Sequence, residues 1–139
     1  MVKIEQLDKM DADHSEYVRT QFEMYASQKN IRGDYTDFAF AAKENNETAG
    51  IITGHICYDE AHVSELIVDE KYRGMKIGSS LLTFVEGYCK DRGIERITLT
   101  TYEFQAPIFY LKNGFSIEFI RHSKLNPRLD KYFLIKSIG

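Results

Sequence analysis

One segment of the chain combines two glycines with two cations at a strand-to-helix transition. It reads Arg73-Gly74-Met75-Lys76-Ile77-Gly78-Ser79, between a β-rich run and an amphipathic helical pattern. The first turn of a helix has free N–H groups and a partial positive charge. Glycines let the backbone approach a ligand closely, and Arg73 and Lys76 add cationic donors. The segment therefore predicts a cradle for an anion such as a pyrophosphate.

Other phosphate-binding loops match this segment less well. A Walker loop requires a lysine after its last glycine, whereas Gly78 is followed by Ser79 and Ser80. A dinucleotide fingerprint requires G-x-G-x-x-G, whereas this chain has only G-x-x-x-G. The alternative without a ligand is an ordinary strand-to-helix turn that exposes an arginine and a lysine.

This segment and a later block resemble the GCN5-related N-acetyltransferase (GNAT) family, in particular a small bacterial subgroup of unassigned substrate. The family motif [QR]-x-x-G-x-[GA] matches at Arg73 and Gly78, and Lys76 stands where the motif has its middle glycine. The family block A-x-x-x-Y-x-x-x-G-F is matched by residues 106–115. The two blocks lie at the expected separation, and the resemblance covers nearly the whole chain.

The resemblance implies acetyl-CoA as co-substrate, no metal, and a defined set of cofactor-binding positions. Tyr110 matches the tyrosine that acts as general acid on the departing thiolate. Glu103 stands where many members have an asparagine that contacts the cofactor. A Tyr110 ring that only packs on the sheet is the structural alternative. The expected cofactor-binding residues are Leu66, Ile67, Val68, Arg73, Gly74, Met75, Lys76, Ile77, Gly78, Ser79, Glu103, Phe109 and Lys112.

Three residues are candidates for the base that removes a proton from the acceptor amine. Glu65 is the first choice, because it directly precedes the segment expected to bind the acetyl group. Glu103 and His62 follow in that order, and each could act directly or through water. Strand alternation places Glu65 and His62 on opposite faces unless a β-bulge intervenes.

We therefore expect an N-acetyltransferase in which the amine attacks acetyl-CoA directly within a ternary complex. The alternative is a non-catalytic module that binds or senses acyl-CoA. We expect a small amine as acceptor, with a peptide amine as a second option. Carboxylates and aromatic rings in the first half would suit a cationic amine, and these residues are Tyr17, Glu23, Tyr25, Tyr35 and Asp37.

The patterning predicts an α+β (mixed α/β) fold, with helices flanking a mixed, mostly antiparallel GNAT-like sheet of about seven strands. We expect a single acetyltransferase domain over residues 1–139, since this length suits one domain. Asp13 and Glu16 predict a helix start, and residues 77–89 carry a helical apolar stripe. Strands are expected over residues 2–7, 38–42, 49–58, 62–69, 94–101, 115–120 and 132–138, and a short helix over 105–112.

The composition of the chain argues against some classes of binding partner. The net charge of −3 opposes a nucleic-acid surface, although residues 1–70 carry −9 and residues 71–139 carry +6. No run of apolar residues is long enough for a membrane span, and the charged N-terminus does not read as a signal peptide.

Cys57 and Cys89 form no disulfide framework, so we expect a cytoplasmic location. A homodimer is an option, and a metal site at His55, Cys57 and His62 lacks a fourth ligand.

Overall fold

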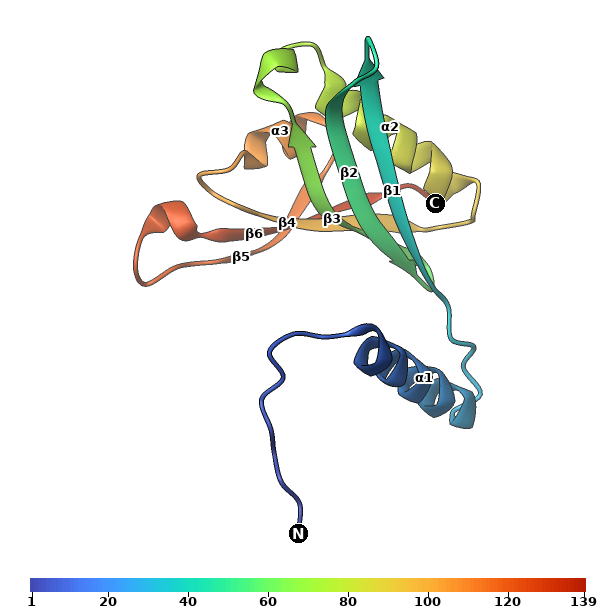
Figure 1. The fold of residues 1–139 in the computed structure, drawn as a ribbon. Helices are drawn as coiled ribbons and strands as arrows, with labels where there is room; N and C mark the ends of the chain where they lie inside the picture. Colours follow the sequence, from blue (N-terminus) through green and yellow to red (C-terminus); the bar gives the residue numbers. More distant parts are fainter. The chain divides into compact units, whose positions relative to one another are not determined.

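Residues 1–34 and residues 35–139 form two units in the computed structural model, which describes residues 1–139 (Figure 1). The first unit contains one helix, α1 (Ala12–Gln28). Asp11 caps it, because its side chain accepts a hydrogen bond from the His14 N–H at 2.8 Å. The predicted cap at Asp13 is therefore wrong by two residues, and Asp13 lies within the first turn.

The predicted strand over residues 2–7 does not form. No strand is assigned within residues 1–34, and Val2 and Ile4 are almost fully exposed. A strand persists only when its N–H and C=O groups pair with a neighbouring strand, and residues 2–7 have no such partner. The sheet consequently has six strands, and the expected number of seven is wrong.

The second unit is built on a mixed sheet with the order β1-β2-β3-β4-β6-β5. Neighbouring strands run antiparallel except β3 and β4, which run parallel. The expectation of a mixed, mostly antiparallel sheet flanked by helices is confirmed. The strands are β1 (Tyr35–Glu44), β2 (Glu47–Cys57), β3 (Glu60–Val68), β4 (Arg96–Tyr102), β5 (Ser116–Arg121) and β6 (Lys131–Ser137).

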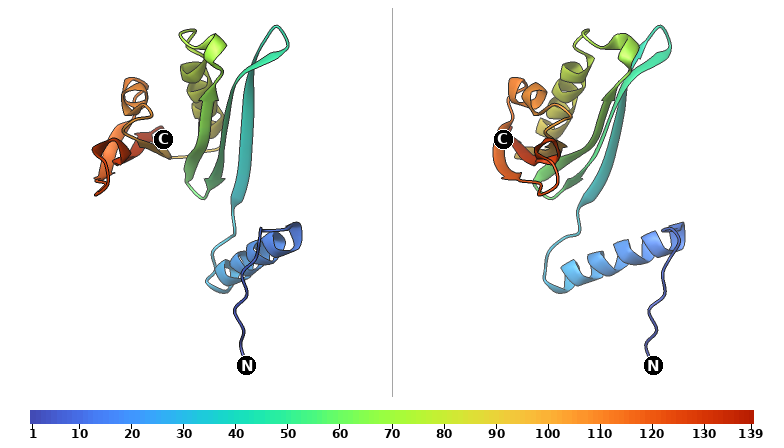
Figure 2. Two further views of the ribbon diagram at one scale, coloured as in Figure 1. Left: turned by 60° about the vertical axis from the view of Figure 1, so that its left-hand side comes forward. Right: turned by 90° about the vertical axis from the view of Figure 1, so that its left-hand side faces the viewer.

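Helix α2 (Ile77–Lys90) covers one face of this sheet, as two views of the ribbon show (Figure 2). Its apolar stripe buries Leu81, Leu82, Val85 and Cys89, as the 3.6-residue periodicity predicts. These side chains form one hydrophobic core with Phe115 and with residues from five of the strands. None of the helices is both long and apolar enough to cross a lipid bilayer.

Strands β3 and β4 separate soon after they begin. They pair only over residues 60–62 of β3, and the last pair is His62 with Thr98. Beyond this point residues 65–68 of β3 pair with β2 alone. The divergence leaves one backbone edge of β3 without a strand partner, at the segment that the resemblance assigns to the acetyl-pantetheine arm.

A β-bulge at Ser64 reverses the alternation of β3. Gly54 of β2 lies opposite Val63, and Thr53 lies opposite Glu65, so Ser64 is the extra residue. Glu65 therefore shares a face of the sheet with His62, as the sequence allowed only with a bulge. The close approach at this point requires glycine at position 54, because an added Cβ would overlap the His62 carbonyl oxygen and the Phe38 ring.

Three short elements complete the second unit. The 3-10 turn η1 (Glu70–Tyr72) follows β3, helix α3 (Pro107–Lys112) follows β4, and the 3-10 turn η2 (Pro127–Leu129) lies between β5 and β6. Asn45 and Asn46 both have positive φ and form the turn between β1 and β2.

Candidate active site

The predicted anion-binding segment connects η1 to α2. Arg73 is exposed, and its Nε donates to the Val68 carbonyl oxygen at 3.3 Å, which ties the segment to the end of β3. Gly74 has a φ of +85°, and Lys76 adopts the left-handed conformation with φ +60°. Lys76 thus adopts a backbone conformation that is unfavourable for residues with a Cβ but easy for glycine. It does so at the position where the family motif has its middle glycine.

The N–H groups at the N-terminus of α2 are available to donate hydrogen bonds to a ligand. The first intrahelical bond is donated by the Ser80 N–H to the Lys76 carbonyl, so the N–H groups of Ile77, Gly78 and Ser79 have no acceptor within the helix. No side chain caps this terminus, and its first turn contains no acidic residue. The donor set therefore suits a ligand with several phosphate oxygens.

Gly78 fixes the distance between α2 and α3. A Cβ at this position would lie 2.9 Å from Cζ of Phe109 and 3.6 Å from Cγ2 of Val68. The absence of a side chain lets the half-buried Phe109 ring pack directly on the helix start. Phe109 therefore connects the anion-binding segment to α3, which carries Tyr110.

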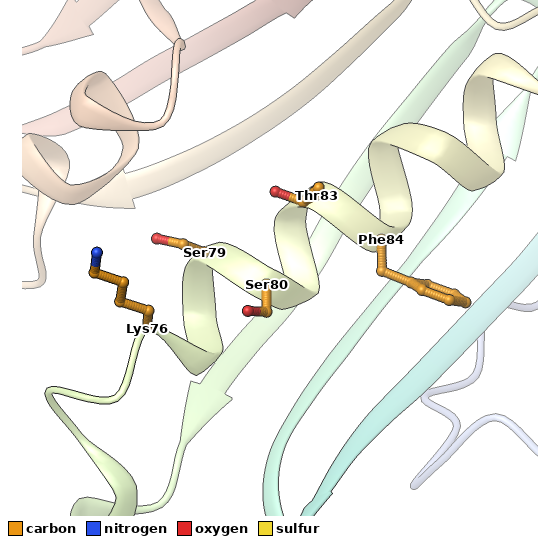
Figure 3. Close-up of a pocket in the computed structure, with 5 residues that line it drawn as sticks. All are labelled: Lys76, Ser79, Ser80, Thr83 and Phe84. Atoms are coloured by element: carbon orange, nitrogen blue, oxygen red, sulfur yellow. The ribbon is translucent and has the colours of Figure 1, made fainter.

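A shallow hollow of about 390 Å³ lies on the outer side of α2 beside this segment. Figure 3 shows Lys76, Ser79 and Thr83 pointing to one side of the helix, with Phe84 directed to the other. The hydroxyl groups at positions 80 and 83 were not among the expected site residues. Ser80 follows Lys76 by four residues and Thr83 follows Ser79 by four, a spacing that places each pair on one surface of a helix.

Tyr110 lies on the helix-covered side of the sheet. Its ring packs edge-on against Phe109 and Phe115, with centroid distances of 5.1 and 5.9 Å. Burial raises the pKa of the Tyr110 hydroxyl, because the phenolate would lose its hydration. The group therefore remains protonated at neutral pH, which is the state required of a proton donor.

Glu65 and His62 lie on the face of the sheet opposite α2. The Glu65 carboxylate is exposed and accepts a hydrogen bond from the Thr53 hydroxyl at 2.9 Å. His62 Nδ1 lies 3.0 Å from the Thr98 hydroxyl, and its ring is 5.5 Å from that of His55. Burial, assisted by the nearby His55, lowers the pKa of His62. Neither Thr53 nor Thr98 carries a sequence signal, because both contacts cross strands.

Glu103 occupies a different place from the other two candidate bases. It follows β4 directly, beyond the point where β3 and β4 separate. Its N–H donates to the Asp130 carbonyl at 2.8 Å, and the next N–H, of Phe104, donates to the Arg128 carbonyl at 3.1 Å. The loop between β5 and β6 thus holds the end of β4.

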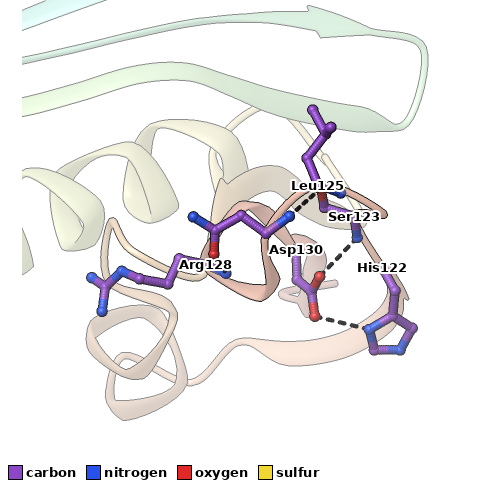
Figure 4. A network of polar contacts seen from close by, with 6 residues as sticks. His122, Ser123, Leu125, Arg128 and Asp130 are labelled. Atoms are coloured by element: carbon purple, nitrogen blue, oxygen red, sulfur yellow. Dashed lines mark hydrogen bonds and ion pairs between the residues drawn. The ribbon is translucent and has the colours of Figure 1, made fainter.

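The Asp130 side chain gives that loop its shape (Figure 4). Its two oxygens accept hydrogen bonds from the Ser123 N–H and from His122 Nδ1, both at 2.8 Å. The Ser123 N–H, followed by the His122 side chain, lowers the pKa of Asp130. Asn126 caps η2 by accepting from the Arg128 N–H at 3.0 Å. Asp130 is not among the site residues expected from the sequence.

Other expected positions divide between the two units. Tyr17, Glu23 and Tyr25 lie on α1, where they are exposed, whereas Tyr35 and Asp37 lie on β1. Leu66 and Val68 are half-buried, and Ile67, Met75 and Lys112 are exposed. No group of three or more His, Cys, Asp or Glu side chains is placed to hold a metal ion.

The fold and the two sequence blocks define a class of protein. The sequence profile described as the acetyltransferase (GNAT) family matches residues 2–115, and the chain belongs to this family. The resemblance inferred from the sequence is thereby confirmed. Blasticidin-S acetyltransferase of Streptomyces morookaense is 34% identical over 79 residues, which are 56% of this chain and 58% of that protein. The chain spans about half the length of the curated relatives it matches.

Solved structures support the fold independently. A 1.9 Å crystal structure of an acetyltransferase from Bacillus cereus has a TM-score of 0.75 and 24% identity, and the match covers 96% of this chain and 97% of that one. A Bacillus anthracis protein solved in complex with acetyl coenzyme A has a TM-score of 0.67 and 22% identity. That match covers 81% of this chain and 68% of the other.

Proposed function

We propose that this chain is an acetyl-CoA-dependent N-acetyltransferase that moves the acetyl group to an amine by direct attack in a ternary complex. The observation that carries the proposal is the uncapped start of α2, where free N–H groups lie beside Lys76 and Arg73. Membership of the acetyltransferase family and the relative solved with acetyl coenzyme A support the same ligand. Bound acetyl-CoA would supply an activated acetyl thioester.

Residues of this chain would bind acetyl-CoA, stabilise the developing charge and protonate the departing sulfur. Residues 73–79 would hold the pyrophosphate, and the free edge of β3 at residues 66–68 would align the acetyl-pantetheine arm. Backbone N–H groups at Ile67 or Val68 would stabilise negative charge on the carbonyl oxygen. Tyr110 would donate its hydroxyl proton to the departing sulfur, and Phe109 would keep Tyr110 beside the anion-binding segment.

The base that removes the amine proton is proposed to be Glu65 or Glu103. The bulge at Ser64 turns Glu65 toward the face opposite α2, where Thr53 orients its carboxylate. Glu103 lies past the divergence of β3 and β4. His62, on the same face as Glu65, remains the third candidate.

We propose a small amine as acceptor, with a peptide amine as the second option. The acetyltransferase relative named for blasticidin S supports the first. We also propose that both units belong to one acetyltransferase domain, since the family match begins at residue 2 and extends to residue 115. The unpaired cysteines fit a cytoplasmic location, and the open outer edges of β1 and β5 are where a second copy could add.

Acetyl-CoA should raise the melting temperature of the full chain, whereas AMP should not. A ligand at about a hundred times its dissociation constant adds about 2.7 kcal/mol to the free energy of unfolding. For a chain of this length we expect a shift of several degrees. The measurement is a thermal melt with and without each ligand. No shift at millimolar acetyl-CoA would reject the proposed function.

Two substitutions of Lys76 separate the effect of its backbone conformation on stability from the effect of its charge on binding. Lys76→Gly removes the side chain from a left-handed position, whereas Lys76→Ala keeps a Cβ there. We expect the glycine variant to be about 1 kcal/mol more stable than the alanine variant. Both should weaken acetyl-CoA binding several-fold, and this loss should shrink at high salt because it comes from a screened charge. Calorimetry and denaturant melts measure the two quantities. Equal stability of the two variants would contradict the strain at Lys76.

A further inference from the structure

Glu103 carries the only buried side-chain polar atom that lacks a hydrogen-bond partner. This atom is Oε2. A buried acceptor without a donor is costly, and more so when the group is charged. Native structures seldom retain such an atom unless a ligand, ion or water satisfies it.

The surroundings of Glu103 supply no compensating charge. None of the ion pairs of the structure includes it, although Lys136, Arg96 and Lys71 pair with other carboxylates. Its backbone is fixed by the Asp130 loop, so the side chain starts from a defined position at the end of β4. The backbone at Glu103 is therefore fixed, and its buried Oε2 has no hydrogen-bond partner in the chain.

The chemistry of a partner for Glu103 Oε2 follows from the carboxylate itself. An ionised carboxylate only accepts hydrogen bonds, so the partner must be a donor. A cationic donor matches it best, because charge-assisted hydrogen bonds are about twice as strong as neutral ones. Glu103 follows β4, the strand that parts from the proposed acetyl-binding segment of β3 after Thr98, and the amine of the proposed reaction would enter between these two strands.

We propose that the Glu103 carboxylate binds an ammonium group of the acceptor and thereby selects cationic amines. This inference rests on the proposed function and narrows it to a class of acceptor. An amide N–H of the pantetheine arm is a neutral donor that could occupy the same oxygen, and the experiment distinguishes the two.

The test measures the binding of two small probes to the full chain saturated with CoA, which cannot donate an acetyl group. 1,4-Diaminobutane is cationic at both ends, and 1,4-butanediol is its neutral isostere. We expect the diamine to bind the wild-type complex and the diol not to bind. Glu103→Gln should weaken diamine binding roughly 10- to 100-fold, a far larger factor than any change in the Kd of CoA.

Two further variants control for charge and for folding. Glu118→Gln removes the same charge from an exposed position on β5 and should leave diamine binding unchanged. Glu103→Met replaces the carboxylate with an apolar chain of similar length. It should lose diamine binding as Glu103→Gln does. Neither Glu103 variant should melt below the wild type, because Glu103→Gln removes the negative charge from the buried position and Glu103→Met removes both carboxylate oxygens.

The outcomes separate this proposal from the proposed function. Normal CoA binding with equal diamine affinity in wild type and Glu103→Gln would overturn this proposal alone, as would a wild-type complex that binds no diamine. A loss of CoA affinity in Glu103→Gln without a loss of diamine affinity would assign the oxygen to the pantetheine arm instead. Failure of the wild type to bind CoA would overturn the proposed function and this inference together.

Discussion

Replacement of Tyr110 by phenylalanine is expected to lower the turnover of acetyl transfer about 100-fold and to leave acetyl-CoA affinity nearly intact. The proposed role of the hydroxyl is to protonate the departing sulfur, and general acid catalysis typically contributes 10²- to 10⁴-fold. Phenylalanine preserves the edge-on packing against Phe109 and Phe115, so the cofactor site should not change shape. The measurement is kcat by thiol release, with an amine that the wild type acetylates, beside the Kd of acetyl-CoA.

Tyr88 provides a matched control for the loss of a hydroxyl. It lies on α2, where its ring packs on Phe40 and under the Arg92 guanidinium. Tyr88→Phe should keep both kcat and Kd within about twofold of the wild type. An unchanged kcat in Tyr110→Phe would remove Tyr110 as the acid. A wild-type chain that binds acetyl-CoA but acetylates no amine of a broad panel would instead favour the non-catalytic acyl-CoA module.

Replacement of Gly54 by alanine is expected to destabilise the fold by about 3 kcal/mol or more. The new Cβ would collide with the His62 carbonyl oxygen and with the Phe38 ring, one of which belongs to the backbone of the neighbouring strand. Backbone cannot yield as a flexible side chain can, so β2 and β3 must move apart at the bulge. We expect the melting temperature to fall by about 10 °C.

Gly87 offers the opposite result from the same chemical change. It is exposed in the last turn of α2, and a Cβ there would meet nothing within 4 Å. Gly87→Ala should therefore stabilise the chain by about 0.5–1 kcal/mol, because alanine restricts the unfolded chain and favours the helix. Thermal melts of both variants test the pair. A Gly54→Ala variant as stable as the wild type would contradict the strand register at the bulge.

Features encoded by neighbouring residues were predictable. The apolar stripe of α2 and the short helix of Tyr110 follow from periodicity, Pro107 and Gly114, all of which act within a few residues. The capping of α1 shows the limit of such signals. Asp11 and Asp13 are both acceptable caps, and which one acts depends on where the backbone becomes extended, as it is at Asp11.

The strand count and the faces of β3 depended on partners far away in the chain. Residues 2–7 have strand-like alternation, yet no neighbouring strand accepts their hydrogen bonds. The bulge at Ser64 requires β2 across the sheet, with Gly54 to permit the close approach. Alternation alone could not decide whether Glu65 and His62 share a face.

The sequence by itself determined the anion-binding segment, the Tyr110 block and hence the family, because these are short motifs whose chemistry is local. Only the tertiary structure decided that Lys76 adopts the left-handed conformation, that β3 and β4 part after His62, and that Glu103 has a buried oxygen without a donor. These properties arise from register, loop docking and burial, which join residues that are distant in the chain.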